Sequence, residues 1–159
     1  MTMSRQILGR AESVDALRKL LLEAAAAGER ELWCSDPDFA DWPLNEPALL
    51  QALAQWALPH RRLHLLAQHY DEMPRRHPRF VHWRRDFGHV VDAWCAEHLE
   101  AGLHPRLLVA GARSLEVLDP VHWRSVESQE RSRALLLLQR FDAIAQRSAP
   151  GFAASTLGL

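Results

Sequence analysis

The sequence predicts an α/β fold in which a mixed β-sheet is flanked by helices. Two observations lead to this prediction. Segments with helical spacing of apolar residues alternate along the chain with short strand-like segments, and two apolar runs meet around a Gly-Ala-Arg turn, as in a β-hairpin. Such alternation is typical of a sheet that carries helices on both faces. A chain of 159 residues fits one domain and can bury a core without a disulfide or a metal.

In the first half of the chain, predicted helices and strands alternate. Residues 12–27 carry apolar side chains three and four positions apart and stop at Gly28, which predicts a helix. Residues 30–34 predict a strand, which a Ser-Asp-Pro-Asp loop ends. Residues 47–58 predict a second helix. The proline at its start is compatible with a helix, because the missing N–H of a first-turn residue costs no hydrogen bond. Residues 62–66 predict the second strand.

The middle of the chain predicts a third helix and a third strand. Residues 78–87 predict the helix, and Phe80, Trp83 and Phe87 stand at i, i+3 and i+7, which places them on one face. A glycine ends this helix, and residues 89–94 follow as a strand.

The last part of the chain predicts a hairpin and a closing helix. Residues 105–110 and 114–118 are the two strands of the hairpin. After Asp119-Pro120 we expect a loop, and residues 128–146 predict the last helix. The side chains expected to face inward from that helix are Leu135, Leu138, Phe141, Ile144 and Ala145.

Composition and charge limit the class of protein. We expect one domain over residues 1–150 and a partly ordered tail over residues 151–159. The net charge of −1 argues against a bulk field for binding polyanions. Residues 1–13 show no signal-peptide pattern, and no stretch approaches the roughly 18 apolar residues of a membrane span. Cys34 and Cys95 lack Cys-x-x-Cys spacing, which favours a reducing, cytoplasmic location.

The segment His104-Pro105-Arg106, just ahead of the predicted hairpin, is the most informative for function. It resembles the signature of the phospholipase D-like superfamily, which is His-x-Lys-x4-Asp at the start of a strand. His104 matches the histidine, Arg106 stands at the lysine position and Gly111 stands at the aspartate position.

The resemblance implies a chemistry for each position. In the superfamily two such motifs meet across one site, where one histidine attacks phosphorus and the other protonates the leaving oxygen. An imidazole suits both tasks because it titrates near neutrality, and a fixed cation stabilises charge on the phosphoryl group. A carboxylate orients the imidazole. Arg106 keeps the cation, whereas Gly111 removes the carboxylate, so the resemblance implies a phosphate-binding site at His104 and Arg106 and a poor phosphodiesterase.

Residues 12–150 as a whole are similar to a family of uncharacterised bacterial phospholipase D-like domains without an intact motif. The closing segment at residues 139–150 and the strand at residues 62–66, followed by an arginine-rich helix, carry this similarity. The resemblance implies one half of a phospholipase D-like fold. It also implies a possible homodimer, because single-motif members build their site across two subunits.

A basic stretch offers a second candidate site. Its five arginines are Arg75, Arg76, Arg79, Arg84 and Arg85. With Phe80 and Trp83 between them, they are candidates for following a nucleic-acid backbone while an aromatic ring stacks on a base. The alternative is a solvated helix face whose aromatic side chains belong to the core. The near-neutral net charge and the aromatic spacing favour that alternative.

Metal, cofactor and nucleophile motifs are weak. We expect no metal and no cofactor, since histidine pairs four apart fall outside the predicted helices and no glycine-rich phosphate loop is present. Asp36, Asp38 and Asp41 suggest a hard cation, but turn formation is the favoured role. Cys34 follows a strand as a nucleophile can, although a buried structural thiol is favoured.

These observations together predict a non-catalytic phospholipase D-like module that binds a phosphate-bearing ligand or a protein partner around His104 and Arg106. Two alternatives remain open. One is a weak phosphodiesterase or nuclease that acts as a dimer through His104, and the other is a nucleic-acid-binding protein that uses the stretch from Arg75 to Arg85.

Overall fold

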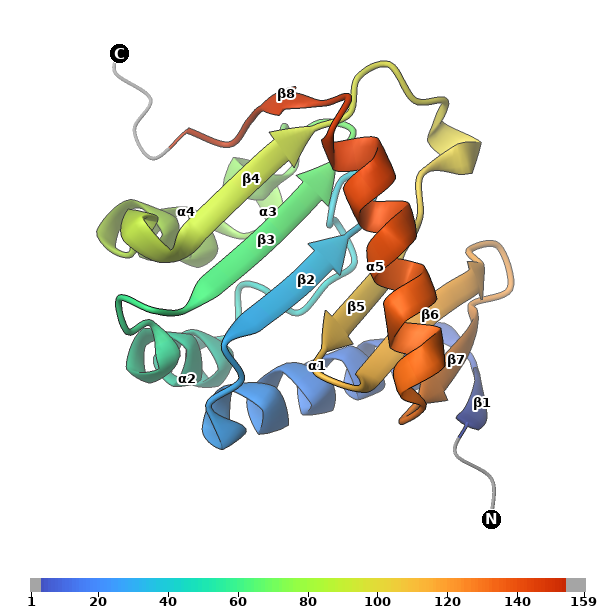
Figure 1. Ribbon diagram of the computed structural model, residues 1–159. Helices are drawn as coiled ribbons and strands as arrows, with labels where there is room; N and C mark the ends of the chain where they lie inside the picture. The colour runs from blue at the N-terminus through green and yellow to red at the C-terminus, as the bar shows by residue number, and fades with distance from the viewer. Residues whose placement is uncertain (1–3, 154–159) are drawn as a thin grey trace.

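The computed structural model describes residues 4–153. Figure 1 shows one twisted sheet with helices on both of its faces. The helices are α1 (Arg10–Ala27), α2 (Pro47–Trp56), α3 (Met73–Arg76), α4 (Pro78–Asp86) and α5 (Arg131–Ala145), with short 3-10 turns at Gly88–Val90 and Ala101–Leu103. The strands are β1 (Ser4–Leu8), β2 (Glu31–Ser35), β3 (Arg62–Ala67), β4 (Val91–Cys95), β5 (Leu107–Ala110), β6 (Arg113–Asp119), β7 (Arg124–Ser128) and β8 (Ala149–Pro150).

The sheet is mixed, as the sequence predicted. Its strand order is β1-β7-β6-β5-β2-β3-β4-β8. Strands β2, β3 and β4 are parallel to one another, and every other pairing is antiparallel. The chain runs through α2 between β2 and β3, and through α3 and α4 between β3 and β4, which is the helical crossover that parallel strands need.

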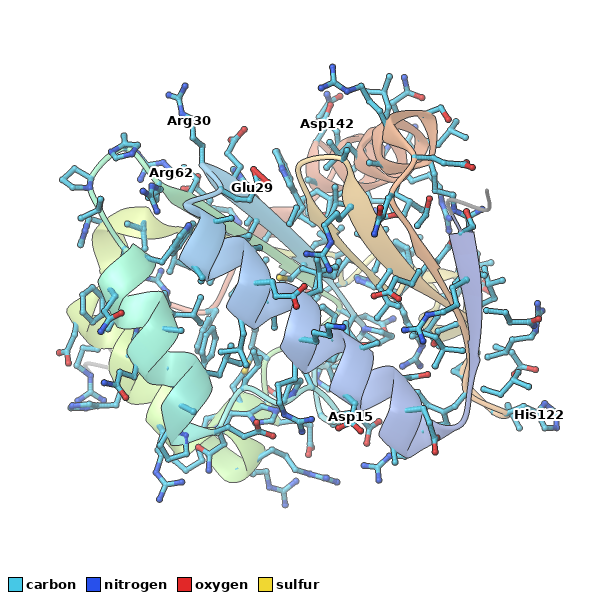
Figure 2. The ribbon with its side chains drawn as sticks, turned by 90° about the horizontal axis from the view of Figure 1, so that it is seen from below. Asp15, Glu29, Arg30, Arg62, His122 and Asp142 are labelled. Carbon is cyan, nitrogen blue, oxygen red and sulfur yellow. The ribbon has the colours of Figure 1, made fainter. Side chains whose placement is uncertain are left out.

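The two faces of the sheet are covered unequally. Helices α1, α2 and α4 contact one another in series and cover one face, above a large core that includes Leu21, Leu53 and Phe80. Helix α5 lies on the opposite face, as Figures 1 and 2 both show, above a smaller core around Leu66 and Phe141. Figure 1 shows that α5 leaves much of β3 and β4 uncovered on its side.

Each helix and strand that the sequence predicted is present, with ends shifted by a few residues, but three strands were missed, namely β1, β7 and the two-residue β8. The segment after Asp119-Pro120, up to residue 127, was expected to form a loop, whereas β7 occupies Arg124–Ser128 and pairs with both β6 and β1. Strands β1 and β7 lack an apolar pattern. In β1 only Ile7 is buried, and the fully buried residues of β7 are Ser125 and Ser128.

The predicted inward face of α5 was partly wrong. Ala134, Leu137 and Phe141 are buried, whereas Leu135 is 55% exposed. Leu138, Ile144 and Ala145 are half-buried against the smaller core. The helix is oriented by Glu116 of β6, which forms ion pairs of 2.7 Å with both Arg133 and Arg140 on the adjoining side of α5.

The start of the expected C-terminal tail is packed against the domain. The Gly151 N–H donates to the Ala93 carbonyl at 3.0 Å, and the Phe152 ring stacks on Tyr70 with 5.2 Å between ring centroids. Residues 154–159 of that tail lie outside the described residues. Within residues 4–153, no helix is long and apolar enough to cross a membrane.

Candidate functional site

The motif residues lie where β5 begins beside the end of β2. These two strands are antiparallel, and Ser35 at the end of β2 is in register with Leu107 at the start of β5. The pairing brings His104 and Arg106 next to Ser35 and Asp36, about 70 residues earlier in the chain. The corner also lies at the carboxyl ends of β2 and β3, where α/β sheets commonly hold their sites.

His104 faces into the protein. Only 4% of its surface is exposed, and its Nε2 lies 3.2 Å from the Leu66 carbonyl oxygen and 3.1 Å from the Ser35 hydroxyl. Because a carbonyl can only accept, Nε2 carries the hydrogen, while the Ser35 hydroxyl donates to the Pro105 carbonyl at 2.8 Å. The Nδ1 atom is buried and has no partner among the described residues.

The surroundings of His104 keep its imidazole neutral. Burial lowers the pKa of His104 to about 4, and the nearby Arg106 cation acts in the same direction, while the bond to the Leu66 carbonyl opposes them. At neutral pH this imidazole is therefore uncharged, and it donates its one hydrogen bond inside the protein. It presents no free nitrogen to solvent.

Arg106 is paired with a carboxylate that the sequence analysis did not connect to it. Its Nη1 lies 3.3 Å from Oδ1 of the buried Asp36, and its side chain is 26% exposed. The other oxygen of Asp36 accepts the N–H groups of Phe39 at 2.8 Å and Asp38 at 3.2 Å, which is the predicted turn-forming role. Burial raises the pKa of Asp36 to about 6, although Arg106 and the two N–H groups act against the rise.

Gly111 lies in the turn between β5 and β6, at the far end of β5 from His104. Its φ of +62° is left-handed, a conformation that glycine adopts readily and that strains an aspartate. A Cβ at this position would stand 2.6 Å from the Glu29 carboxylate. The turn itself therefore favours glycine where the superfamily signature has aspartate.

The arginines of the basic stretch are not all exposed. Arg84 is buried and donates to the Phe152 carbonyl at 3.1 Å. Phe80 and Trp83 belong to the core, as expected if the stretch is a solvated helix face with aromatic side chains turned inward. The four exposed members are Arg75, Arg76, Arg79 and Arg85.

Other candidate chemistry is limited. Among residues 4–153, no group of three His, Cys, Asp or Glu side chains is placed to hold a metal ion. Cys34 and Cys95 are free thiols, and burial raises the pKa of both, most strongly for Cys34. A thiol that resists ionisation is a weak nucleophile, which agrees with a structural role for Cys34.

No model of a known protein family matches the chain, and no curated protein matches it in sequence. Solved structures do resemble it. TrmBL2, an archaeal chromatin protein with a novel mode of DNA binding, matches with a TM-score of 0.67 and 12% identity over 92% of this chain. The chain spans 53% of the TrmBL2 chain, which is about half its length.

Two further matches are phospholipase D relatives of similar length. NucT from Helicobacter pylori has a TM-score of 0.61 and 5% identity, and the match covers 92% of this chain and 98% of NucT. Nuc from Salmonella typhimurium, a phospholipase D family member, has a TM-score of 0.56 and 9% identity over 92% of this chain and 97% of its own. At such low identities the likeness concerns the fold alone. The chain has the mixed α/β fold of phospholipase D-like proteins.

Proposed function

We propose that this protein is a non-catalytic phospholipase D-like module that works by binding. The observation that carries the proposal is the burial of His104, whose Nε2–H is held by the Leu66 carbonyl and whose Nδ1 is enclosed. A nucleophilic histidine must present an unprotonated nitrogen to phosphorus, and a general acid must present a labile proton. Neither is available to a substrate in this arrangement.

Hydrolysis of a chromogenic phosphodiester by the purified protein tests this proposal, with His104→Ala as the variant. We expect no turnover above background for either protein, because the wild-type imidazole cannot reach phosphorus. Turnover by the wild type that disappears in the variant would overturn the proposal. A circular dichroism spectrum of the variant checks that it folds.

We place a phosphate-bearing ligand, or an anionic group of a protein partner, at Arg106. Its guanidinium is partly exposed and offers a planar donor fork. Asp36 competes for the same cation at 3.3 Å, and its pKa of about 6 means that it becomes neutral below this pH. Anion binding at Arg106 is therefore expected to strengthen as the pH falls through about 6.

Dimethyl phosphate is a suitable probe, because its single negative charge does not change over this pH range. We expect its NMR-detected affinity to rise severalfold between about pH 7 and about pH 5, and to fall in Arg106→Gln. Arg124→Gln, which removes an exposed arginine on β7, should leave the affinity unchanged. An equal effect of both substitutions would remove Arg106 from the site.

The enzyme alternative requires a homodimer in which two His104 side chains face each other. The observation against it is that His104 is 4% exposed in the single chain. Sedimentation velocity gives the oligomeric state, and a dimer that hydrolyses phosphodiesters would favour this alternative.

We place the protein in the cytoplasm because both cysteines are unpaired.

Nucleic-acid binding is the second candidate, supported by the four exposed arginines on α3 and α4 and by the DNA-binding neighbour TrmBL2. It predicts an affinity that falls steeply with rising salt, because bound counterions are released. The discriminating variant changes Arg75, Arg76, Arg79 and Arg85 to glutamine and keeps the buried Arg84. An unchanged salt dependence in this variant would rule out the basic stretch.

A further inference from the structure

The uncovered part of the sheet beside α5 contains a groove of about 370 Å³. Strands β2, β3 and β4 and the C-terminal half of α5 form its floor and walls. The residues that define its chemistry are Trp33, His64, Asp92, Trp94, Phe141 and Asp142. The volume lies near the lower end of the range for sites that hold small ligands. None of these residues belongs to the corner formed by His104 and Arg106.

Aromatic rings form one part of the groove. Trp33 stacks on His64 with 3.7 Å between ring centroids and meets the edge of Phe141 at 5.3 Å, so its orientation is fixed. Trp94 lies on the same face of the sheet, two residues beyond Asp92 on β4. Trp94 is half-buried and has no aromatic partner among the described residues, which leaves its ring available for a ligand to stack on.

Asp92 supplies a carboxylate that the chain pairs only loosely. Its side chain is 47% exposed, and the nearest basic nitrogens are Arg62 Nε at 3.7 Å and His64 Nδ1 at 3.8 Å. Both neighbours are engaged elsewhere. Arg62 donates to the His89 carbonyl, and His64 Nε2 lies 3.0 Å from Glu31. Asp92 accepts no hydrogen bond from the described residues, although it lies in register with His64 on the groove floor.

A second carboxylate stands on the opposite wall. Asp142 projects from α5, on the opposite side of the sheet from α1 and α2, where Figure 2 labels it. It accepts a hydrogen bond from Gln146 of the same helix at 2.8 Å, and within residues 4–153 it forms no ion pair. The groove therefore combines an available tryptophan ring with two carboxylates, of which Asp92 has only a loose ion pair with Arg62 at 3.7 Å and Asp142 has no ion pair among the described residues.

We infer that this groove binds an organic cation, and that a planar guanidinium group fits it best. A guanidinium stacks on a tryptophan face while its N–H groups pair with a carboxylate, so one group satisfies both Trp94 and Asp92. An ammonium ion shares the charge but lacks the planar face. An anion would be repelled by Asp92 and Asp142, and a purely apolar ligand would leave Asp92 unsatisfied.

The test uses the ¹⁵N-labelled full chain and the six indole N–H signals of its tryptophans. Arginine amide with an acetylated α-amino group is the cationic probe (called arginine amide below), and citrulline amide acetylated in the same way is its neutral counterpart of nearly the same shape (called citrulline amide below), because a free α-amino group would itself be a cation near neutral pH. We expect arginine amide to shift the signals of Trp33 and Trp94 with a dissociation constant on the order of 1 mM. Citrulline amide should cause no comparable shift. Equal shifts from both probes, or none from either, would overturn the inference.

Two substitutions locate the site. Trp94→Leu and Asp92→Asn should each weaken arginine amide binding about two- to fivefold, which is the range for exposed cation–π contacts and ion pairs. The matched controls are Trp123→Leu on the turn before β7 and Asp71→Asn, whose carboxylate is 89% exposed. These controls should bind like the wild type. A loss of affinity in the controls as large as in the groove variants would contradict the assignment.

A second binding experiment, which compares a peptide with arginine amide, identifies the natural source of the cation. A peptide capped at both ends, whose only charged group is one internal arginine, would identify a protein segment as the natural occupant if it binds tenfold tighter than arginine amide. Equal affinities would identify a small molecule. A second copy of this chain is the remaining occupant. It would be shown by a sedimentation coefficient that falls in Trp94→Leu while arginine amide has no effect, and that result would overturn the inference.

Discussion

His104 and Asp36 are buried within one corner of the sheet. The pKa of His104 is lowered and the pKa of Asp36 is raised, so burial favours the neutral form of each side chain. The sequence identified His104 and Arg106 as a pair but could not identify their partners. The Leu66 carbonyl is 38 residues from His104, and Asp36 is 70 residues from Arg106. Only the pairing of β2 with β3 and β5 brings these groups together. The spacing of residues along the chain does not predict contacts between segments this far apart.

The displaced pKa of His104 predicts a specific pH dependence of stability. The folded-state pKa of about 4 lies below the ordinary value of 6.5, so the unfolded chain binds more protons between these values. The contribution of His104 is therefore complete above pH 6.5 and is lost as the pH falls toward 4, by about 3 kcal/mol at most.

His104→Gln tests this pH dependence, because glutamine keeps an N–H donor and does not titrate. Urea unfolding at a series of pH values should show the wild type losing up to about 3 kcal/mol more than the variant between neutral pH and about pH 4. His82→Gln on α4 controls for the loss of one exposed imidazole. Parallel pH profiles for wild type and His104→Gln would contradict the described environment of His104.

At the scale of elements, the sequence predicted the existence of α5 but not its orientation. Leu135, Leu137 and Leu138 lie in one apolar run, and helical spacing alone does not decide which of them faces the sheet. The pairs that Glu116 forms with Arg133 and Arg140 orient the helix, and Glu116 lies on β6, 17 residues before Arg133 and 24 before Arg140. Strands β1 and β7 were missed because they have little apolar pattern, since β1 buries only Ile7 and the buried residues of β7 are Ser125 and Ser128.

The observed orientation of α5 predicts unequal effects of two alanine substitutions. Phe141 is 1% exposed and fills the smaller core, so Phe141→Ala should lower the free energy of unfolding by about 3–5 kcal/mol. Leu135 is 55% exposed, and Leu135→Ala should change it by less than about 1 kcal/mol. Chemical denaturation measures both values. Equal destabilisation would mean that α5 packs with the face that the sequence predicted.

At the scale of the whole molecule, alternation of helices and strands was sufficient to predict the class of fold. The extra strands, the strand order and the open groove beside α5 were beyond it, because they depend on which distant segments pair. One sheet joins the two cores, and the C-terminal segment closes on β4 through Gly151 and β8. The two cores should therefore unfold together.

Coincident unfolding is measurable with two probes. Tryptophan fluorescence and far-ultraviolet circular dichroism should report the same midpoint in urea, as two-state unfolding of a single domain requires. A fluorescence transition that precedes the loss of secondary structure would show that one core opens independently.

The protonation state of His104 tests the central claim most directly, because the proposed lack of catalysis rests on a buried, neutral imidazole that donates from Nε2. Long-range ¹H–¹⁵N NMR of the histidine rings distinguishes the two nitrogens and follows each ring through a pH titration. We predict that His104 remains an Nε2–H tautomer at neutral pH and titrates near pH 4. A ring that titrates near its ordinary value of 6.5 and carries its hydrogen on Nδ1 would contradict the account and restore His104 as a catalytic candidate.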